Sequence, residues 1–341
     1  MAKRNYSKRS NKIEPAQLTM YFAPGSANAN ASRSDYIDLS QVASIINRRF
    51  YRQGINWAVG GFKILSTDQS NGLVTIQKLP NTWTMANAWE KSMRTWNRMN
   101  REALSETESV RPKFLDFKVY ADAAHHAAGF GANLLPLAGS STSTTAAGEW
   151  SPSKIYVPTA QNINAAQTTD FELIATGASF TAAGASGLSA VSLIEGYAAS
   201  RGLPNVLDPN APGDADDTAG LTPENWMAAL FNDGNTQTQE VLDDMITENN
   251  IAPYPFENDG TSVDTMYPGG GNQMAGMLFH DITFISPTTV GGHTYVKGGN
   301  FPCGLIKITQ TRTEAPLAIQ ILIDLVPGMH RGYECEPMTE M

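Results

Sequence analysis

The segment 316–328, PLAIQILIDLVPG, constrains the fold of this chain more than any other. Ile319, Ile321 and Ile323 alternate there with Gln320, Leu322 and Asp324. A period of two places alternate side chains on opposite faces of an extended strand, and branched apolar residues favour strands. The Pro-Gly dipeptide that follows ends the pattern. The segment is therefore predicted to be a β-strand.

Other segments carry a similar signal between Gly, Pro and polar turns. The predicted strands are 55–66, 72–80, 114–120, 153–158, 171–177, 277–286, 303–311 and 316–326, with 293–299 as an additional hairpin arm. Strands and helices do not alternate as βαβ units, so a parallel sheet is not expected. The pattern predicts an all-β fold: an eight-stranded antiparallel jelly roll, which is a two-sheet β-sandwich, with helical insertions.

Helical periodicity appears in five parts of the chain. One helix is predicted to begin with Ser40 as its N-cap and to end at Gly54. A second, near 84–104, places Met85, Ala88, Trp89, Met93 and Trp96 on one face, which we expect to be buried. Three further helices are predicted at 185–202, capped by Ser186, and at 221–231 and 239–250.

Charge is distributed unevenly along this chain, whose formal net charge is -9. Residues 1–120 hold 18 Lys and Arg against 9 Asp and Glu, whereas residues 121–341 hold 6 against 24. The first twelve residues hold five cations and no anion, and 178–277 holds 14 acidic residues and one basic residue. This contiguous split indicates two surfaces with different neighbours.

Four segments follow from these patterns. They are a basic disordered arm and lead-in (1–34), the first part of the jelly roll (35–177), an acidic, partly helical insertion (178–277), and the last strands with a C-terminal tail (278–341). The chain contains no apolar run long enough to span a membrane, and no apolar region follows the basic N-terminus as in a secretory signal.

Motifs for chemistry are sparse. The pair His125 and His126 lies in a predicted polar loop with no third metal ligand at a known spacing. Asp214, Asp216 and Asp217 crowd one loop and are candidates for a structural divalent cation such as Ca²⁺, although the EF-hand spacing is absent and a solvated acidic loop is the alternative. Nucleophile, zinc-protease and P-loop motifs are missing, so we expect neither an enzyme nor another cofactor. Cys303 and Cys335 are expected to be unpaired thiols.

Three phrases and the basic arm suggest a family. The phrases VRPKFLDFKVYAD (110–122), GGNFPCGLIKI (298–308) and DLVPGMHRGYECEPM (324–338), with the strand order, resemble capsid proteins of small circular single-stranded DNA viruses that encode a rolling-circle replication initiator. The resemblance covers about 55–177 and 277–341 and does not extend to the acidic insertion. Relatives often have more arginine in the arm and a basic overall charge, and this chain departs from both.

The resemblance implies a function. Such a chain assembles with itself into an icosahedral shell of a multiple of 60 copies, packages a single-stranded genome, and is located in the virion, with the host nucleus as a site of assembly. A host receptor is a further implied partner, with no residue assigned to it. The acidic insertion would form an outer protrusion, and basic residues would face the genome through phosphate contacts without base readout. The expected contacts are Lys3, Arg4, Lys8, Arg9, Lys12, Arg48, Arg49, Arg52, Arg94, Arg98 and Arg101.

Two alternatives stay open. A lectin-like β-sandwich module that binds a carbohydrate or another ligand would use the acidic loops for cations or sugars. A cupin-like enzyme would need several metal-binding histidines on adjacent strands, and only His280 and His293 lie in or beside predicted strands. The enzyme therefore ranks last.

Overall fold

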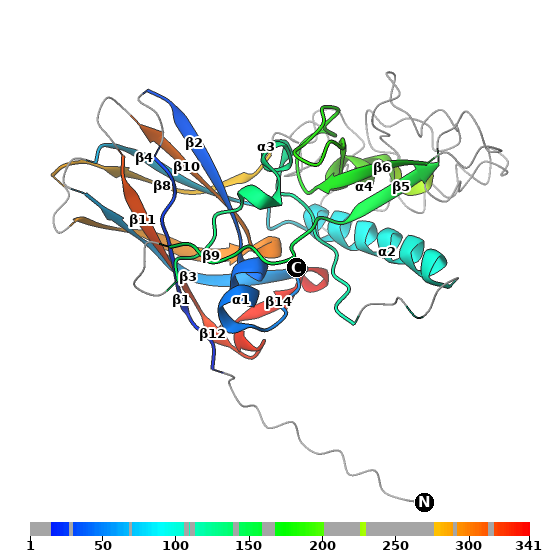
Figure 1. The fold of residues 1–341 in the computed structure, drawn as a ribbon, viewed down its shortest axis with the longest axis horizontal. Coiled ribbons are helices and arrows are strands. Elements are labelled where there is room, and N and C mark those ends of the chain that lie inside the picture. The colour runs from blue at the N-terminus through cyan, green and yellow to red at the C-terminus, as the bar shows by residue number, and fades with distance from the viewer. Residues whose placement is uncertain are drawn as a thin grey trace, which may run out of the picture.

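The structure is a computed structural model that describes residues 15–26, 30–67, 70–105, 109, 113–138, 143–158, 168–200, 226–229, 276–288, 292–312 and 317–341. Figure 1 shows a set of long strands on one side and a lobe built around a long helix on the other. The predicted arm cations (Lys3, Arg4, Lys8, Arg9 and Lys12), the loop aspartates (Asp214, Asp216 and Asp217) and the predicted helix 239–250 lie outside the described residues.

Two antiparallel sheets form the strand-rich part (Figure 1). The first has the order β1-β11-β3, and both β9 and β14 pair with β3; these strands are Thr19–Phe22, Ile319–Leu325, Ile55–Ser66, His293–Phe301 and Cys335–Pro337. The second has the order β2-β10-β4-β8, from Ser32–Asp38, Leu305–Arg312, Gly72–Lys78 and Leu278–Ile285. The predicted all-β sandwich of antiparallel strands is therefore compatible with the structure.

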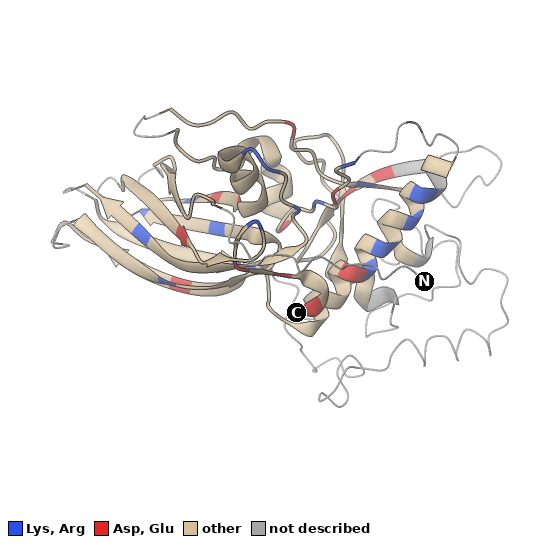
Figure 2. Cartoon of the chain, turned by 90° about the horizontal axis from the view of Figure 1, so that it is seen from below, with Lys and Arg blue, Asp and Glu red and all other residues tan. Residues whose placement is uncertain are grey.

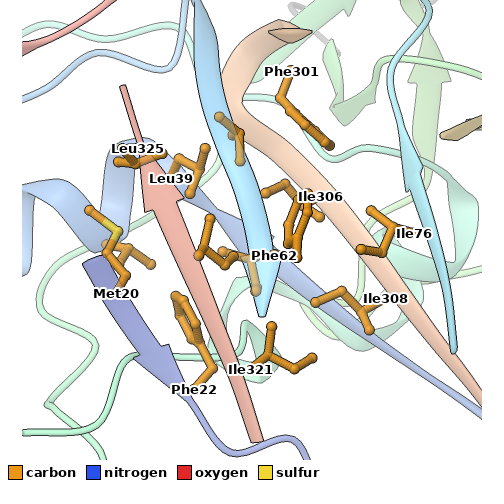
Figure 3. Close-up of a cluster of buried hydrophobic side chains, with 14 of the residues drawn as sticks. Met20, Phe22, Leu39, Phe62, Ile76, Phe301, Ile306, Ile308, Ile321 and Leu325 are labelled. Carbon is orange, nitrogen blue, oxygen red and sulfur yellow. The ribbon is translucent and has the colours of Figure 1, made fainter. Parts of the chain in front are cut away.

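An apolar core lies between these sheets. Figure 3 shows Phe62 and Ile321 of the first sheet beside Ile76, Ile306 and Ile308 of the second, and all five are almost fully buried. Burying one such side chain contributes about 1.5–3 kcal/mol. The alternation predicted for 316–328 is confirmed, because the three isoleucines of β11 are buried while Gln320 and Asp324 are exposed.

A second lobe lies in the connection between β4 and β8. Its elements are α2 (Trp83–Ser105), α3 (Ala123–Ala128), β5 (Lys154–Pro158), β6 (Thr168–Ile174), β7 (Ala190–Ser192), α4 (Leu193–Ser200) and α5 (Trp226–Ala229). β5 and β6 are antiparallel, and β6 and β7 are parallel. The predicted buried face of the second helix is confirmed: Met85, Ala88, Trp89 and Trp96 belong to the core of this lobe, and Met93 packs against it.

Shorter elements complete the described chain. They are α1 (Leu39–Asn47), β12 (Pro327–Gly328), β13 (Gly332–Tyr333) and the 3₁₀ turns η2 (Phe130–Ala132), η6 (Pro302–Gly304) and η7 (Met338–Glu340). Cys303 and Cys335 are unpaired, as expected. Among the helices described, none combines the length and the apolar character that crossing a membrane requires.

Three of the predicted strands do not belong to the sandwich. The segment 114–120 forms only an isolated bridge, between Tyr120 and Ile174. Its alternating apolar side chains pack against α2 instead, with the rings of Phe117 and Trp89 5.9 Å apart. The predicted strands 153–158 and 171–177 exist as β5 and β6, but they belong to the second lobe, where β6 also forms a short parallel pair with β7. The sandwich gains β1, β2 and the full strand β9 in their place. The division of the chain at residues 34, 177 and 277 stays a prediction.

The predicted ends of the first helix are also wrong. Asp38, not Ser40, is the N-cap of α1, because its carboxylate accepts a 2.9 Å hydrogen bond from the Ser40 backbone N–H. The helix ends at Arg48, which adopts the left-handed conformation with φ 53°. Gly54 serves packing instead, since a Cβ there would lie 2.2 Å from the Trp89 ring.

The third predicted helix begins later than expected. Within 185–202 the structure places β7 first and then α4, so Ser186 is not its N-cap. Ser192 precedes α4, and its hydroxyl oxygen accepts a 3.3 Å hydrogen bond from the Glu195 backbone N–H. Of the predicted helix 221–231, only Trp226–Ala229 lies within the described residues.

One buried aspartate joins the lobe to the sandwich. Asp122 caps α3 and accepts hydrogen bonds from the His125 backbone N–H at 2.8 Å, from the Tyr36 hydroxyl on β2 at 2.7 Å and from Lys307 Nζ on β10 at 2.8 Å. The rings of Tyr36 and His125 stack with centroids 4.4 Å apart. Burial alone would raise the pKa of Asp122, but the bonds from Lys307 and Tyr36 hold that pKa below its ordinary value. The carboxylate is thus a charged contact shared by both parts of the molecule.

Candidate nucleic-acid interface

The C-terminal end of α1 brings a predicted arginine pair to the start of the described chain. Arg48 is exposed at the left-handed turn that ends the helix. The Arg49 guanidinium donates a 3.0 Å hydrogen bond to the carbonyl of Pro15. The backbone N–H of Gln17 donates to Asn47 Oδ1 at 3.1 Å. The described chain therefore begins beside these two arginines.

Helix α2 displays a second set of predicted cations. Arg94, Arg98 and Arg101 are exposed and lie on the helix face opposite the buried tryptophans, and Figure 2 shows basic residues along this helix. The buried face fixes the orientation of the helix, in part through a 3.1 Å hydrogen bond from Trp96 Nε1 to the Lys154 carbonyl. Glu90, one turn earlier, pairs with Arg94. The structure thus places the three arginines in one row, which we call the α2 stripe.

A hollow of about 430 Å³ lies between α2 and the segment that joins α1 to β3. The residues that line it include Phe50, Arg52, Trp89, Met93, Asn97, Asp116, Phe117, His330 and Arg331. Arg52 Nε donates a 3.3 Å hydrogen bond to the Leu115 carbonyl, and the Arg52 guanidinium lies 5.5 Å from the centre of the Phe50 ring. The Arg331 guanidinium donates to the Phe50 carbonyl. Cations and aromatic rings therefore share one cavity wall.

Asp116 is the acidic group in this wall. Burial raises its pKa to about 7, against the opposing effects of Lys118, of the Gln53 backbone N–H and of Arg52. Buried Asp38 adds to the rise. The carboxyl group therefore changes charge near neutral pH, beside two arginines.

This raised pKa predicts a pH-dependent stability. The folded state holds the Asp116 proton up to about pH 7, whereas the unfolded chain releases it near 3.8, so folding loses stability as pH rises through that window. An Asp116→Asn variant keeps an acceptor for the Gln53 N–H and has no charge to bury. We expect it to be more stable than the parent by about 2 kcal/mol at pH 8, less than the full shift implies because the side chain is partly exposed, and equal to it near pH 4.

Thermal unfolding of both proteins between pH 4 and pH 8 checks this expectation. Asp281→Asn, on β8 outside the hollow, is the matched control. Equal unfolding free energies for parent and Asp116→Asn across the whole range would contradict a buried, titrating Asp116.

The two adjacent histidines are buried in the second lobe. His125 and His126 lie in α3 and are buried, so the predicted polar loop is wrong. His125 Nε2 lies 2.7 Å from Asn133 Oδ1, and burial lowers its pKa to about 4. His126 Nε2 lies 2.9 Å from Glu172 Oε2 in the lobe interior. In the part of the chain that the structure describes, no group of three or more His, Cys, Asp and Glu side chains could hold a metal ion.

The structure brings together some predicted contacts and adds others. Arg52 lines the same hollow as α2, which carries the stripe. Phe50, Asp116 and Arg331 belong to this site but were not predicted. Asp116 and Arg331 lie within two of the three family-like phrases, whereas Phe50 is recognised only when α2 covers it.

Comparisons with protein-family models, with curated proteins and with solved structures found no match to this chain. Its function is therefore inferred from the fold and from the interface described above.

Proposed function

We propose that the sandwich is a jelly roll and that the chain is a capsid protein, which assembles with itself into an icosahedral shell around single-stranded nucleic acid. The strand order carries this proposal. Apart from the short C-terminal β14, the sandwich strands along the chain are β1, β2, β3, β4, β8, β9, β10 and β11. The first pairs with the eighth, the second with the seventh, the third with the sixth and the fourth with the fifth, the order of a folded hairpin rolled into two sheets. Jelly rolls of this kind occur in viral capsids, lectins and cupins.

The basic surface favours the capsid among these three classes. Arg49 bonds the carbonyl of Pro15, where the described chain begins, Arg52 lines the hollow beside α2, and the α2 stripe is exposed. Clustered arginines bind phosphates and release counterions, which suits a partner recognised without regard to sequence. The acidic insertion would then face away from the genome, because like charges repel.

Imaging of the purified full-length chain tests the assembly. We expect closed particles in negative-stain micrographs and a large sedimenting species. A 36.8 kDa monomer at every concentration would contradict the capsid proposal. Glycan binding that is lost on chelation, without particles, would favour the lectin-like module instead.

Neutralising the α2 stripe tests the nucleic-acid contact. We expect an Arg94→Gln/Arg98→Gln/Arg101→Gln variant to bind a fluorescent (dT)30 oligonucleotide more weakly. Its plot of log affinity against log salt should be shallower by about 2, because each lost phosphate contact on a single strand removes about 0.7 from the slope. Fluorescence anisotropy at several salt concentrations measures both quantities.

The control removes three cations elsewhere, in Lys63→Gln/Lys297→Gln/Arg312→Gln on β3, β9 and β10. It should keep the parent slope. An equal loss in both variants would mean that net charge, and not the α2 stripe, determines binding.

A further inference from the structure

We propose that the hollow between α2 and the α1–β3 segment holds one nucleotide unit of the bound strand, with its base against the Phe50 and Phe114 rings and its phosphate on Arg52 and Arg331. This inference rests on the proposed function and assigns a defined subsite to it. The volume of about 430 Å³ falls within the range of small-ligand sites.

The aromatic part of the hollow fits a base. The Phe50 ring lines the cavity, and the Phe114 ring packs on it with centroids 5.1 Å apart. Phe114 is 53 % exposed, so its ring is open to a ligand. Aromatic faces accept any base by stacking, and this explains how binding can be tight without sequence preference. Asn97 of α2 lines the same cavity and offers an amide to a base edge.

The cationic part fits a phosphate. Arg52 and Arg331 each use part of the guanidinium to bond a backbone carbonyl, of Leu115 and of Phe50 respectively. These bonds hold the two groups in place. A guanidinium has five N–H donors, so the remaining donors can still bind phosphate oxygens. The arrangement is therefore preorganised for an anion beside an aromatic surface.

Asp116 gives this site a pH dependence. Its charged form repels a phosphate, and burial raises its pKa to about 7. Lys118 and Arg52 lower the pKa of Asp116, and buried Asp38, whose own pKa is raised by burial, raises it. His330, which also lines the hollow, has a pKa lowered from its ordinary value by burial. Between pH 6.5 and pH 8 the change of charge in the hollow therefore comes from Asp116. Binding should weaken as pH rises through this window.

Calorimetric titration of the full chain with the dinucleotide d(TpT) tests the site, because a phosphodiester does not titrate in this window. We expect one site per chain, and weaker binding of thymidine alone or of inorganic phosphate alone. Arg52→Gln and Phe114→Ala should each weaken d(TpT) binding at least about fivefold. Lys297→Gln, on β9 and outside the hollow, should leave it unchanged. The parent should bind about threefold or more tighter at pH 6.5 than at pH 8, and Asp116→Asn should remove that difference.

Three outcomes are decisive. Loss of binding in Arg52→Gln and Phe114→Ala, with parent-like melting temperatures, supports the subsite. If the parent binds (dT)30 in a salt-dependent way but does not bind d(TpT), the subsite is overturned and the proposed function stands. The same conclusion follows if Arg52→Gln and Phe114→Ala bind d(TpT) as tightly as the parent. Failure of the parent to bind either ligand overturns both.

Discussion

A Gly298→Ala variant is expected to lose about 3 kcal/mol of unfolding free energy, which is a large fraction of the stability of an ordinary domain. The added Cβ would lie 2.0 Å from the Val59 carbonyl oxygen and 2.5 Å from the Gly60 carbonyl group. Both contacts are with backbone atoms of β3. This strand is paired with β11 on one side and with β9 on the other, so it cannot move away without breaking a ladder. The register between β3 and β11 also shifts at this point. The centre of the sheet therefore needs small residues both for this shift and for the close approach of β9.

Chemical unfolding with urea measures the loss. Gly131→Ala is the matched control, because a Cβ at Gly131 meets nothing within 4 Å. Its unfolding midpoint should stay close to that of the parent. Equal midpoints for Gly298→Ala and the parent would show that β9 does not approach β3 as closely as the structure has it.

Lys307→Met is expected to cost about 2–3 kcal/mol, because it leaves the Asp122 carboxylate charged, largely buried and without its cation. The remaining bonds from Tyr36 and His125 compensate only in part. Because the folded pKa of Asp122 is depressed, the contribution of the pair is complete above about pH 4 and disappears as pH falls through the folded pKa. The difference between variant and parent should therefore shrink in acid.

Unfolding of Lys307→Met, of Asp122→Asn and of the double variant isolates the coupling between the two side chains, expected at about 1–3 kcal/mol. Lys154→Met provides the same substitution at an exposed pair, since Lys154 Nζ and Asp170 Oδ2 lie 3.8 Å apart with both side chains more than a third exposed. It should cost under about 1 kcal/mol. Equal costs for Lys307→Met and Lys154→Met would refute a special role for the contact between lobe and sandwich.

Local patterns predicted the strands whose own side chains define a buried face. β11 and β4 have an apolar residue at every second position, so the period of two was visible. In contrast, β2 reads SRSDYID, with one exposed, polar half, and it is a strand because β10 pairs along its whole length. The segment 114–120 shows the reverse error, since its alternation serves packing on a helix. Pairing partners far apart in sequence decide such cases, and no local window contains them.

The candidate interface, like the strands, was predicted only in part. The amphipathic pattern of α2 was enough to place its arginines in solvent, because the opposite face is rich in Met and Trp. The hollow could not be predicted, because α2, the α1–β3 segment and the C-terminal turn of Arg331 meet only in the folded chain. The raised pKa of Asp116 could not be predicted either, because its burial depends on the packing of these same segments.

The place of the second lobe has a consequence for how this protein can vary. The chain leaves the sandwich after Lys78 and returns at Leu278, and these two residues are paired neighbours on adjacent antiparallel strands. For the sandwich, residues 79–277 are thus a single loop whose ends are already closed, and the entropic cost of loop closure grows only slowly with length. The lobe can therefore lengthen or shorten away from its contacts with the sandwich, such as that between Asp122 and Lys307, while the register of β4 and β8 stays intact.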